Sequence, residues 1–197
     1  MTSITWGDTG RYIPDRYVKI ISSDGNSIED EITGVLPIIN SVHHKVHEGC
    51  HFSVSGFETL ASNGSAVFGI VTPNSTKWLH MLYDVEGTTQ TEFYIYENPT
   101  FTSGTVKTAM NSNRNSVKTA SILIYYNPTI TALGDLIYSR SSGVAGATPS
   151  KATTESNFQR EDELILKQNT KYVFKIISKA NDNIISYHGK WYEHTNL

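Results

Sequence analysis

Two strand-like runs near the C-terminal end constrain the fold more than any other feature of this sequence. Residues 171–178 and 184–194 each alternate apolar and polar side chains, and a polar turn, residues 179–183, separates them. Apolar residues at every second position predict strands with one buried face, and a short turn between such strands predicts an antiparallel pair. The side chains expected to face a core are Phe174, Ile176, Tyr187 and Trp191, and those expected on the opposite face are Lys175, His188 and Lys190.

Further runs of the same kind occupy the chain from about residue 42 onward. Clusters of Gly, Pro, Asn and Ser separate runs rich in β-branched and aromatic residues, at 50–57, 65–71, 76–85, 91–97 and 120–126. This spacing predicts seven or eight strands in an all-β, antiparallel β-sandwich. Residues 141–157, rich in Ser, Thr, Gly and Ala, are expected to form a flexible surface loop. One long loop between late strands favours a jelly-roll-like topology over an up-and-down barrel.

Residues 1–41 differ from the domain predicted for residues 42–197. They carry aromatic and basic side chains among Gly, Asp and Ser, with too few apolar neighbours to form a core. We expect an N-terminal arm that packs on the sandwich, on a sister subunit or on another protein; a partly ordered terminus is the alternative. The residues expected to contact a partner are Trp6, Arg11, Tyr12, Arg16 and Tyr17.

The charge and composition argue against several classes of partner. The net charge of −3 includes no basic patch, so we expect neither nucleic acid nor membrane as a partner. The sequence has no apolar run of about 18 residues and no signal-peptide pattern, and its single cysteine, Cys50, rules out an intramolecular disulfide framework. These features predict a protein made in a cytoplasm, and kept there or released by lysis.

The string H-E-x-x-H occurs at residues 47–51. In zinc peptidases a helix places both histidines on one face, with the glutamate as general base. Gly49 and Cys50 are poor helix formers, and the next residues have strand periodicity; on a strand, His47 and His51 would be about 13 Å apart. We therefore predict a polar lead-in to the first strand rather than a peptidase. The wider group His43, His44, His47, Cys50 and His51 leaves open a non-catalytic metal site or a pH-sensitive interface, although ordinary, partly exposed histidines are favoured.

No other pattern predicts catalysis. Nucleophile-elbow, phosphate-loop, dinucleotide-binding and EF-hand spacings are absent from the sequence. The acidic run Glu155, Glu161, Asp162 and Glu163 is expected on a solvated edge. Five tyrosines could stack on sugars or cover a subunit interface: Tyr94, Tyr96, Tyr125, Tyr126 and Tyr192. The prediction is a non-enzymatic protein with no catalytic residue, cofactor or metal site.

Three stretches resemble structural proteins of tailed-bacteriophage virions, of the head-decoration and head-fibre type. They are residues 43–56, residues 70–80 with the later 96–97 and 113–116, and residues 163–172 with 191–194. The resemblance covers about residues 42–197 and implies a non-enzymatic virion component. We expect a homotrimeric capsid decoration (cement) protein, assembled in the host cytoplasm, whose residues 1–41 bind the major capsid protein on the outer surface of the shell. The alternatives are a tail, adaptor or baseplate component and a carbohydrate-binding host-attachment module.

Overall fold

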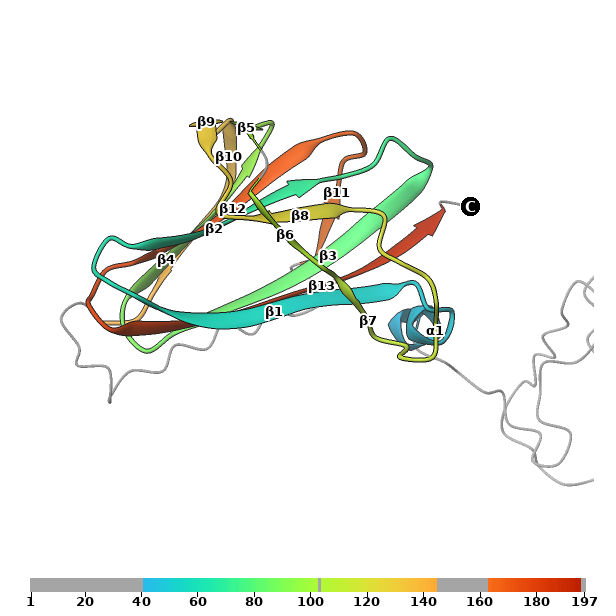
Figure 1. Cartoon of the computed structure of the whole chain (residues 1–197), viewed down its shortest axis with the longest axis horizontal. Coiled ribbons are helices and arrows are strands. Elements are labelled where there is room, and N and C mark those ends of the chain that lie inside the picture. Colours follow the sequence, from blue (N-terminus) through green and yellow to red (C-terminus); the bar gives the residue numbers. More distant parts are fainter. Residues whose placement is uncertain (1–40, 103, 145–162, 196–197) are drawn as a thin grey trace, which may run out of the picture. The chain divides into compact units, whose positions relative to one another are not determined.

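The described part of the chain folds into a β-sandwich and contains one short helix (Figure 1). The computed structural model describes residues 41–102, 104–144 and 163–195. The elements are α1 (Ser41–His47), β1 (His51–Leu60), β2 (Ser65–Val71), β3 (Lys77–Gly87), β4 (Thr91–Glu97), β5 (Thr100–Phe101), β6 (Thr105–Lys107), β7 (Met110–Asn111), β8 (Leu123–Tyr126), β9 (Ile130–Ala132), β10 (Asp135–Ser142), β11 (Leu164–Leu166), β12 (Lys171–Ser178) and β13 (Asn183–Thr195).

The strands pair in the order that defines a jelly roll. One sheet has the order β11-β3-β13-β1-β7 and the other β10-β4-β12-β2-β8-β6, with every pair antiparallel. If β5 to β9 are set aside, eight strands remain, and the first of these pairs with the eighth, the second with the seventh, the third with the sixth and the fourth with the fifth. This is a long antiparallel hairpin rolled into two sheets, as in double-sheet jelly rolls. The predicted fold class is confirmed.

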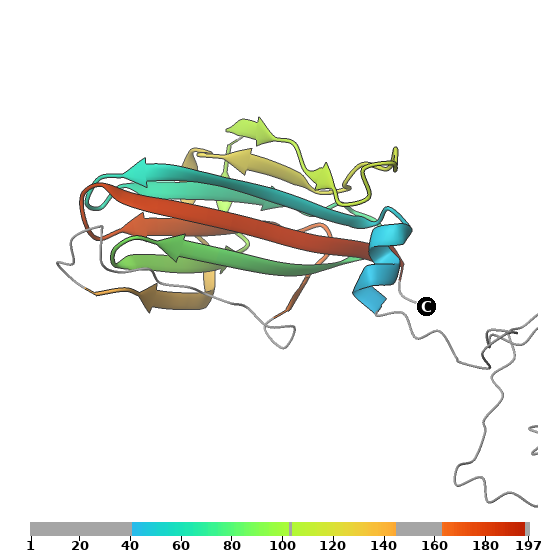
Figure 2. The ribbon, with the colours of Figure 1, turned by 90° about the horizontal axis from the view of Figure 1, so that it is seen from below.

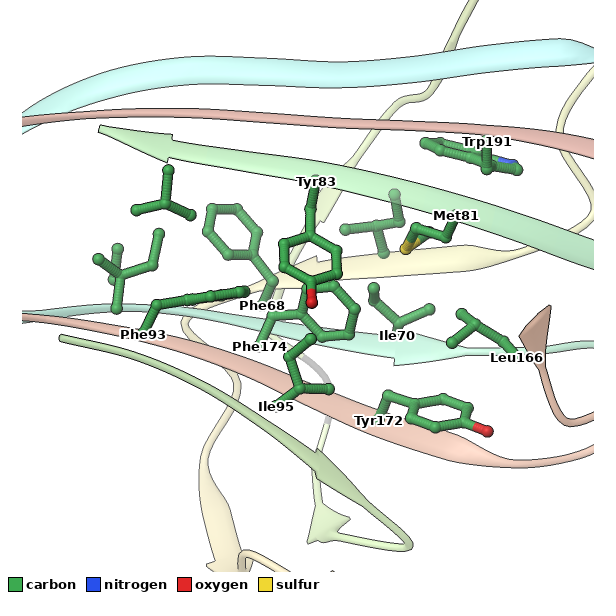
Figure 3. Close-up of a cluster of buried hydrophobic side chains, with 14 of the residues drawn as sticks. Phe68, Ile70, Met81, Tyr83, Phe93, Ile95, Leu166, Tyr172, Phe174 and Trp191 are labelled. Carbon is green, nitrogen blue, oxygen red and sulfur yellow. The ribbon is translucent and has the colours of Figure 1, made fainter. Parts of the chain in front are cut away.

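The core lies between the two sheets and is mainly aromatic and aliphatic (Figure 3). Tyr83 of one sheet contacts Phe93 and Phe174 of the other, with ring centroids 5.0 and 5.4 Å apart. The predicted orientation of the two closing strands is also confirmed: Phe174, Ile176 and Trp191 are buried, Tyr187 is half-buried and His188 is exposed. Burial of each such large side chain stabilises the fold by about 1.5–3 kcal/mol.

Asparagine and aspartate shape the turns between the strands. The non-glycine residues with positive φ among those described are Asn63, Asn98, Asn127, Asn169 and Asp182. Asn and Asp adopt this left-handed conformation at lower cost than other side chains, because their short polar groups bond to nearby backbone. The Asn-Pro pairs at residues 98–99 and 127–128 therefore end strands as the sequence predicts.

The ends of β1, β3 and β13 differ from the predicted runs by one to three residues, and three segments differ more clearly. The residues before β1, predicted only as a polar lead-in to that strand, include helix α1. The strand predicted at 120–126 is shorter, since β8 begins at Leu123. The loop predicted at 141–157 begins later, because the edge strand β10 pairs with β4 as far as Ser142; residues 145–162 lie outside the described residues. Residues 1–40 lie outside them as well, so the predicted arm is not described.

The outer faces of the two sheets differ. On the six-stranded sheet, the ring of Phe101 in β5 lies over Gly69 of β2 and is buried, so the small pair β5–β9 covers part of that face. On the five-stranded sheet, β1, β13 and β3 run side by side, and α1 lies at one end of β1 and β13 (Figure 2). Within the described ranges, no helix or strand crosses the outer face of this sheet.

Candidate functional site

The H-E-x-x-H string spans the junction between a helix and a strand. Helix α1 ends after His47, Gly49 has a φ of +69°, and His51 is the first residue of β1. The N–H of Cys50 donates to the carbonyl of Lys45, and that of Gly49 to the carbonyl of Val46, which is the Schellman pattern that ends helices. The two histidines thus lie on different elements, whereas a zinc peptidase needs both on one helical face.

Glu48 of the same string is engaged in ion pairs on the exposed side of α1. Its carboxylate lies 2.7 Å from Nζ of Lys45 and 3.0 Å from Nε2 of His44. The hydrogen bond from Lys45 lowers the pKa of Glu48, and the nearby positive charges add to this effect, while burial opposes it. A carboxylate held ionised by neighbouring cations is a poor general base.

The wider histidine group predicted around α1 is not gathered at one point. His43 and His47 contact each other, with their Nε2 atoms 2.9 Å apart, while His51 contacts Ser112 through Nδ1 at 2.6 Å. The thiol of Cys50 lies 3.5 Å from Nζ of Lys118. Across the described part of the chain, no group of three or more His, Cys, Asp or Glu side chains is arranged to hold a metal ion.

A different cluster lies on the outer face of the five-stranded sheet, and the sequence did not predict it. His80 of β3 stacks on Tyr192 of β13, with ring centroids 4.6 Å apart and planes 15° apart. Its Nε2 lies 2.9 Å from Nε2 of His194, and its Nδ1 lies 3.0 Å from Oε1 of Glu163. Trp78, 39% exposed, is the cross-strand partner of His194. We call His80, Glu163, Tyr192 and His194 the imidazole cluster.

Glu163 was predicted to be solvated, but its side chain is largely buried. It was expected with Glu155, Glu161 and Asp162 on a solvated edge; the latter three lie outside the described residues. The side chain of Glu163 is 13% exposed and pairs with His80, whose side chain is 15% exposed. The start of β11 causes this, because its pairing with β3 places Ile165 opposite His80 and brings Glu163 beside it.

The five tyrosines considered for sugar stacking do not form one surface. Tyr126 points into the sandwich edge, where its hydroxyl donates to Glu58 at 2.5 Å and its ring contacts Phe68. Tyr94 and Tyr96 stack on each other, with centroids 6.2 Å apart. Tyr125 lies beside Phe101 and Tyr192 belongs to the imidazole cluster on the other sheet.

The cavity between the two sheets is too small to hold a substrate. That cavity measures about 40 Å³ and is lined mostly by apolar side chains, including Phe68, Tyr83 and Phe174. Small-molecule sites usually enclose about 300–1,000 Å³ and present several polar groups. This cavity is a packing gap.

The residues predicted to contact a partner, Trp6, Arg11, Tyr12, Arg16 and Tyr17, lie outside the described residues. In residues 41–102, 104–144 and 163–195, no helix is long and apolar enough to cross a membrane. No protein-family model matches the chain, and neither a curated protein nor a solved structure matches it significantly. The strand pairing alone identifies the fold as a jelly roll.

Proposed function

We propose that this chain is a non-enzymatic structural protein of a tailed-phage particle, most specifically a capsid decoration protein that binds the outer surface of the major capsid shell. The observation that carries the proposal is the jelly-roll pairing of β1 with β13, β2 with β12, β3 with β11 and β4 with β10. Double-sheet jelly rolls are frequent in viral capsid and lectin domains. The resemblance of residues 42–197 to head-decoration and head-fibre proteins favours a viral structural protein over a lectin.

The site geometry is compatible with a structural protein that is present in many copies on the particle. The string that most resembled an active site is divided between α1 and β1, and the cavity between the sheets is too small for a substrate. A decoration protein needs contacts of modest affinity, because many copies on one shell supply avidity. In this proposal residues 1–41 make those contacts, the sandwich projects outward, and the protein assembles as a homotrimer.

Binding to empty capsids of the phage that encodes the protein tests the proposal. The full-length protein is mixed with capsids, and the bound fraction is measured by co-sedimentation. We expect binding to be lost when Trp6, Tyr12 and Tyr17 are changed to Ala, or Arg11 and Arg16 to Glu. The control is Phe57→Ala, which removes a side chain that is 78% exposed on the sandwich itself. Unchanged binding by the arm variants would refute docking through the arm.

The copy number per particle separates a decoration protein from a tail, adaptor or baseplate component. Hundreds of copies are expected for decoration, against about six or twelve for a ring in the tail. Sedimentation equilibrium of the free protein tests the trimer, and a monomer at micromolar concentration would contradict a trimer formed before attachment.

A carbohydrate-binding attachment module is the second candidate, because lectins share this architecture and because Tyr94 and Tyr96 stand side by side on the outer face of the six-stranded sheet. A glycan array distinguishes it. Binding that is lost in a Tyr94→Ala, Tyr96→Ala variant would support the module, and a silent array would exclude it.

A further inference from the structure

Two histidines of the imidazole cluster face each other through the same ring nitrogen. His80 and His194 come from neighbouring antiparallel strands, where each lies diagonally opposite the other. Their Nε2 atoms are 2.9 Å apart and their ring centroids 4.8 Å apart, with the planes 36° from parallel. Both side chains are at least partly buried.

The remaining nitrogens determine where the hydrogens lie. Nδ1 of His194 lies 3.0 Å from the carbonyl oxygen of Thr195, which can only accept, so this Nδ1 carries a hydrogen. Nδ1 of His80 lies 3.0 Å from Oε1 of Glu163, and an ionised carboxylate is likewise only an acceptor. If both Nδ1 atoms carry hydrogens, the two Nε2 atoms present lone pairs to each other. A cation between them is needed to make this arrangement favourable.

Glu163 supplies the opposing charge. The distance of 3.0 Å from its Oε1 to Nδ1 of His80 suits an ion pair, although the angle of this contact is not that of a hydrogen bond and Oε1 is buried. A buried carboxylate beside an imidazole favours positive charge on or at that imidazole.

We propose that His80 and His194 bind a divalent transition-metal ion of the imidazole-preferring class, such as Zn²⁺ or Ni²⁺, through their two Nε2 atoms. Two nitrogens bound to one ion at about 2.0–2.1 Å, with an angle between about 90° and 109°, are about 2.8–3.4 Å apart. The separation of 2.9 Å already falls at the lower end of that range. Water would complete the coordination shell, because the cluster offers two protein ligands.

The surroundings of the pair are those of metal-binding histidines. Such residues usually donate their second ring N–H to a carboxylate or a backbone carbonyl, which fixes the ring and makes the ligand more basic. Glu163 stands in that position for His80, and the carbonyl of Thr195 for His194. Tyr192, stacked on His80, covers the flank of the pair.

A second imidazole pair requires a control. His43 and His47 on α1 also have their Nε2 atoms 2.9 Å apart, but both side chains are exposed. The experiment therefore uses a parent protein carrying His43→Ala and His47→Ala, with any affinity tag removed. Titration of this metal-free parent with Zn²⁺, and separately with Ni²⁺, is followed by calorimetry at neutral pH.

We expect one ion to bind per chain. His80→Ala and His194→Ala should each abolish this binding, and Glu163→Gln should weaken it about tenfold to a hundredfold, as loss of a second-shell partner does. His188→Ala, which removes an exposed histidine from the same face of β13, should bind as the parent does. Thermal unfolding of each variant verifies that it is folded, and His80→Asn and His194→Asn replace any alanine variant that is not.

Long-range ¹H–¹⁵N spectra of the imidazoles provide a readout independent of affinity. Zn²⁺ should shift the Nε2 resonances of His80 and His194, while the Nδ1 resonances should show that both Nδ1 atoms remain protonated. The proposal would be overturned if the parent bound no metal ion, or if His80→Ala and His194→Ala bound it as tightly as the parent does. In that case the two Nε2 atoms would share a proton and no metal ion.

Discussion

The ring of Tyr187 lies directly over Gly56, its cross-strand partner on β1. A Cβ atom built on Gly56 would be 2.4 Å from Oη of Tyr187 and 2.7 Å from its Cζ. The same ring packs on Phe68 across the sandwich, with centroids 4.7 Å apart. Tyr187 thus fills the space that a side chain at position 56 would occupy, and it couples β1 to the core.

Gly56→Ala should lower the free energy of unfolding by about 1–3 kcal/mol, the usual cost of overpacking, because the ring must move off Phe68. Urea denaturation measures it. The cost should largely disappear when Tyr187 is also changed to Val, since the two substitutions act on one contact. Additive effects of the two changes would contradict the coupling.

Gly189 lies in the same pair of strands but in a different environment. A Cβ there would meet Cγ1 of Val54 at 3.5 Å, an ordinary contact, and Gly189 lines the cavity between the sheets. Gly189→Ala should therefore raise the free energy of unfolding by about 0.5–1 kcal/mol, because it fills space and reduces the conformational entropy of the unfolded chain. A decrease in the same urea measurement would show that the cavity is not available to a methyl group.

Asn183, fully buried at the start of β13, holds the turn between β3 and β4. Its Oδ1 accepts from the backbone N–H of Thr89 at 3.0 Å, and its Nδ2 donates to Oγ1 of Thr91 at 3.0 Å. Asn183→Ala should cost about 2–3 kcal/mol, since it leaves a buried donor unsatisfied. The exposed Asn181→Ala, which removes an Oδ1 that accepts from Ser62, is the matched control and should cost less than about 1 kcal/mol. Equal costs would contradict the assigned role.

Glu193 is a buried carboxylate near the end of β13. Its Oε1 accepts from the backbone N–H of Ser121 at 2.8 Å and from Nε1 of Trp191 at 3.2 Å, and its Oε2 lies 3.4 Å from Nζ of Lys77. Glu193→Ala should cost about 3 kcal/mol, because a buried donor on Trp191 and a half-buried donor on Ser121 lose their acceptor, whereas Glu193→Gln keeps an oxygen there and should cost about 1 kcal/mol. Chemical denaturation compares them, and a larger loss for Gln than for Ala would refute this account.

The long strands could be predicted from the sequence because each has one buried face. β2, β4 and β12 begin and end at the predicted residues, and the alternation in β12 and β13 identified which side chains enter the core. The edge strand β10 was not predicted, because its residues do not alternate apolar and polar and most of its side chains are exposed. Helix α1 was missed because seven residues are too few to display a helical period.

The imidazole cluster could not be predicted because it depends on which strands are neighbours. Alternation alone places Tyr192 and His194 on the outward face of their strand, but His80 is 114 residues away from His194 in the chain. Only the rolled topology brings β3 beside β13, and only the start of β11 adds Glu163. The H-E-x-x-H string at residues 47–51 is easier to recognise in the sequence than the imidazole cluster, but its two histidines lie on different elements and do not form a zinc site.

The stability of the fold should fall in mild acid through His51. Burial lowers the pKa of His51 below its ordinary value near 6.5, and the positive charges of Lys190 and His188 lower it further by smaller amounts. Tyr192 lies opposite His51 on β13, and Ser112 contacts its Nδ1. The unfolded chain therefore binds a proton at His51 more readily than the folded chain does. The resulting stability is fully present above about pH 6.5, and it is lost as the pH falls below that value and through the lower pKa of the folded state. His51→Gln should reduce the difference in the free energy of unfolding between pH 7.5 and pH 5.5, measured in urea. An identical pH dependence in the wild type and the variant would show that another group is responsible.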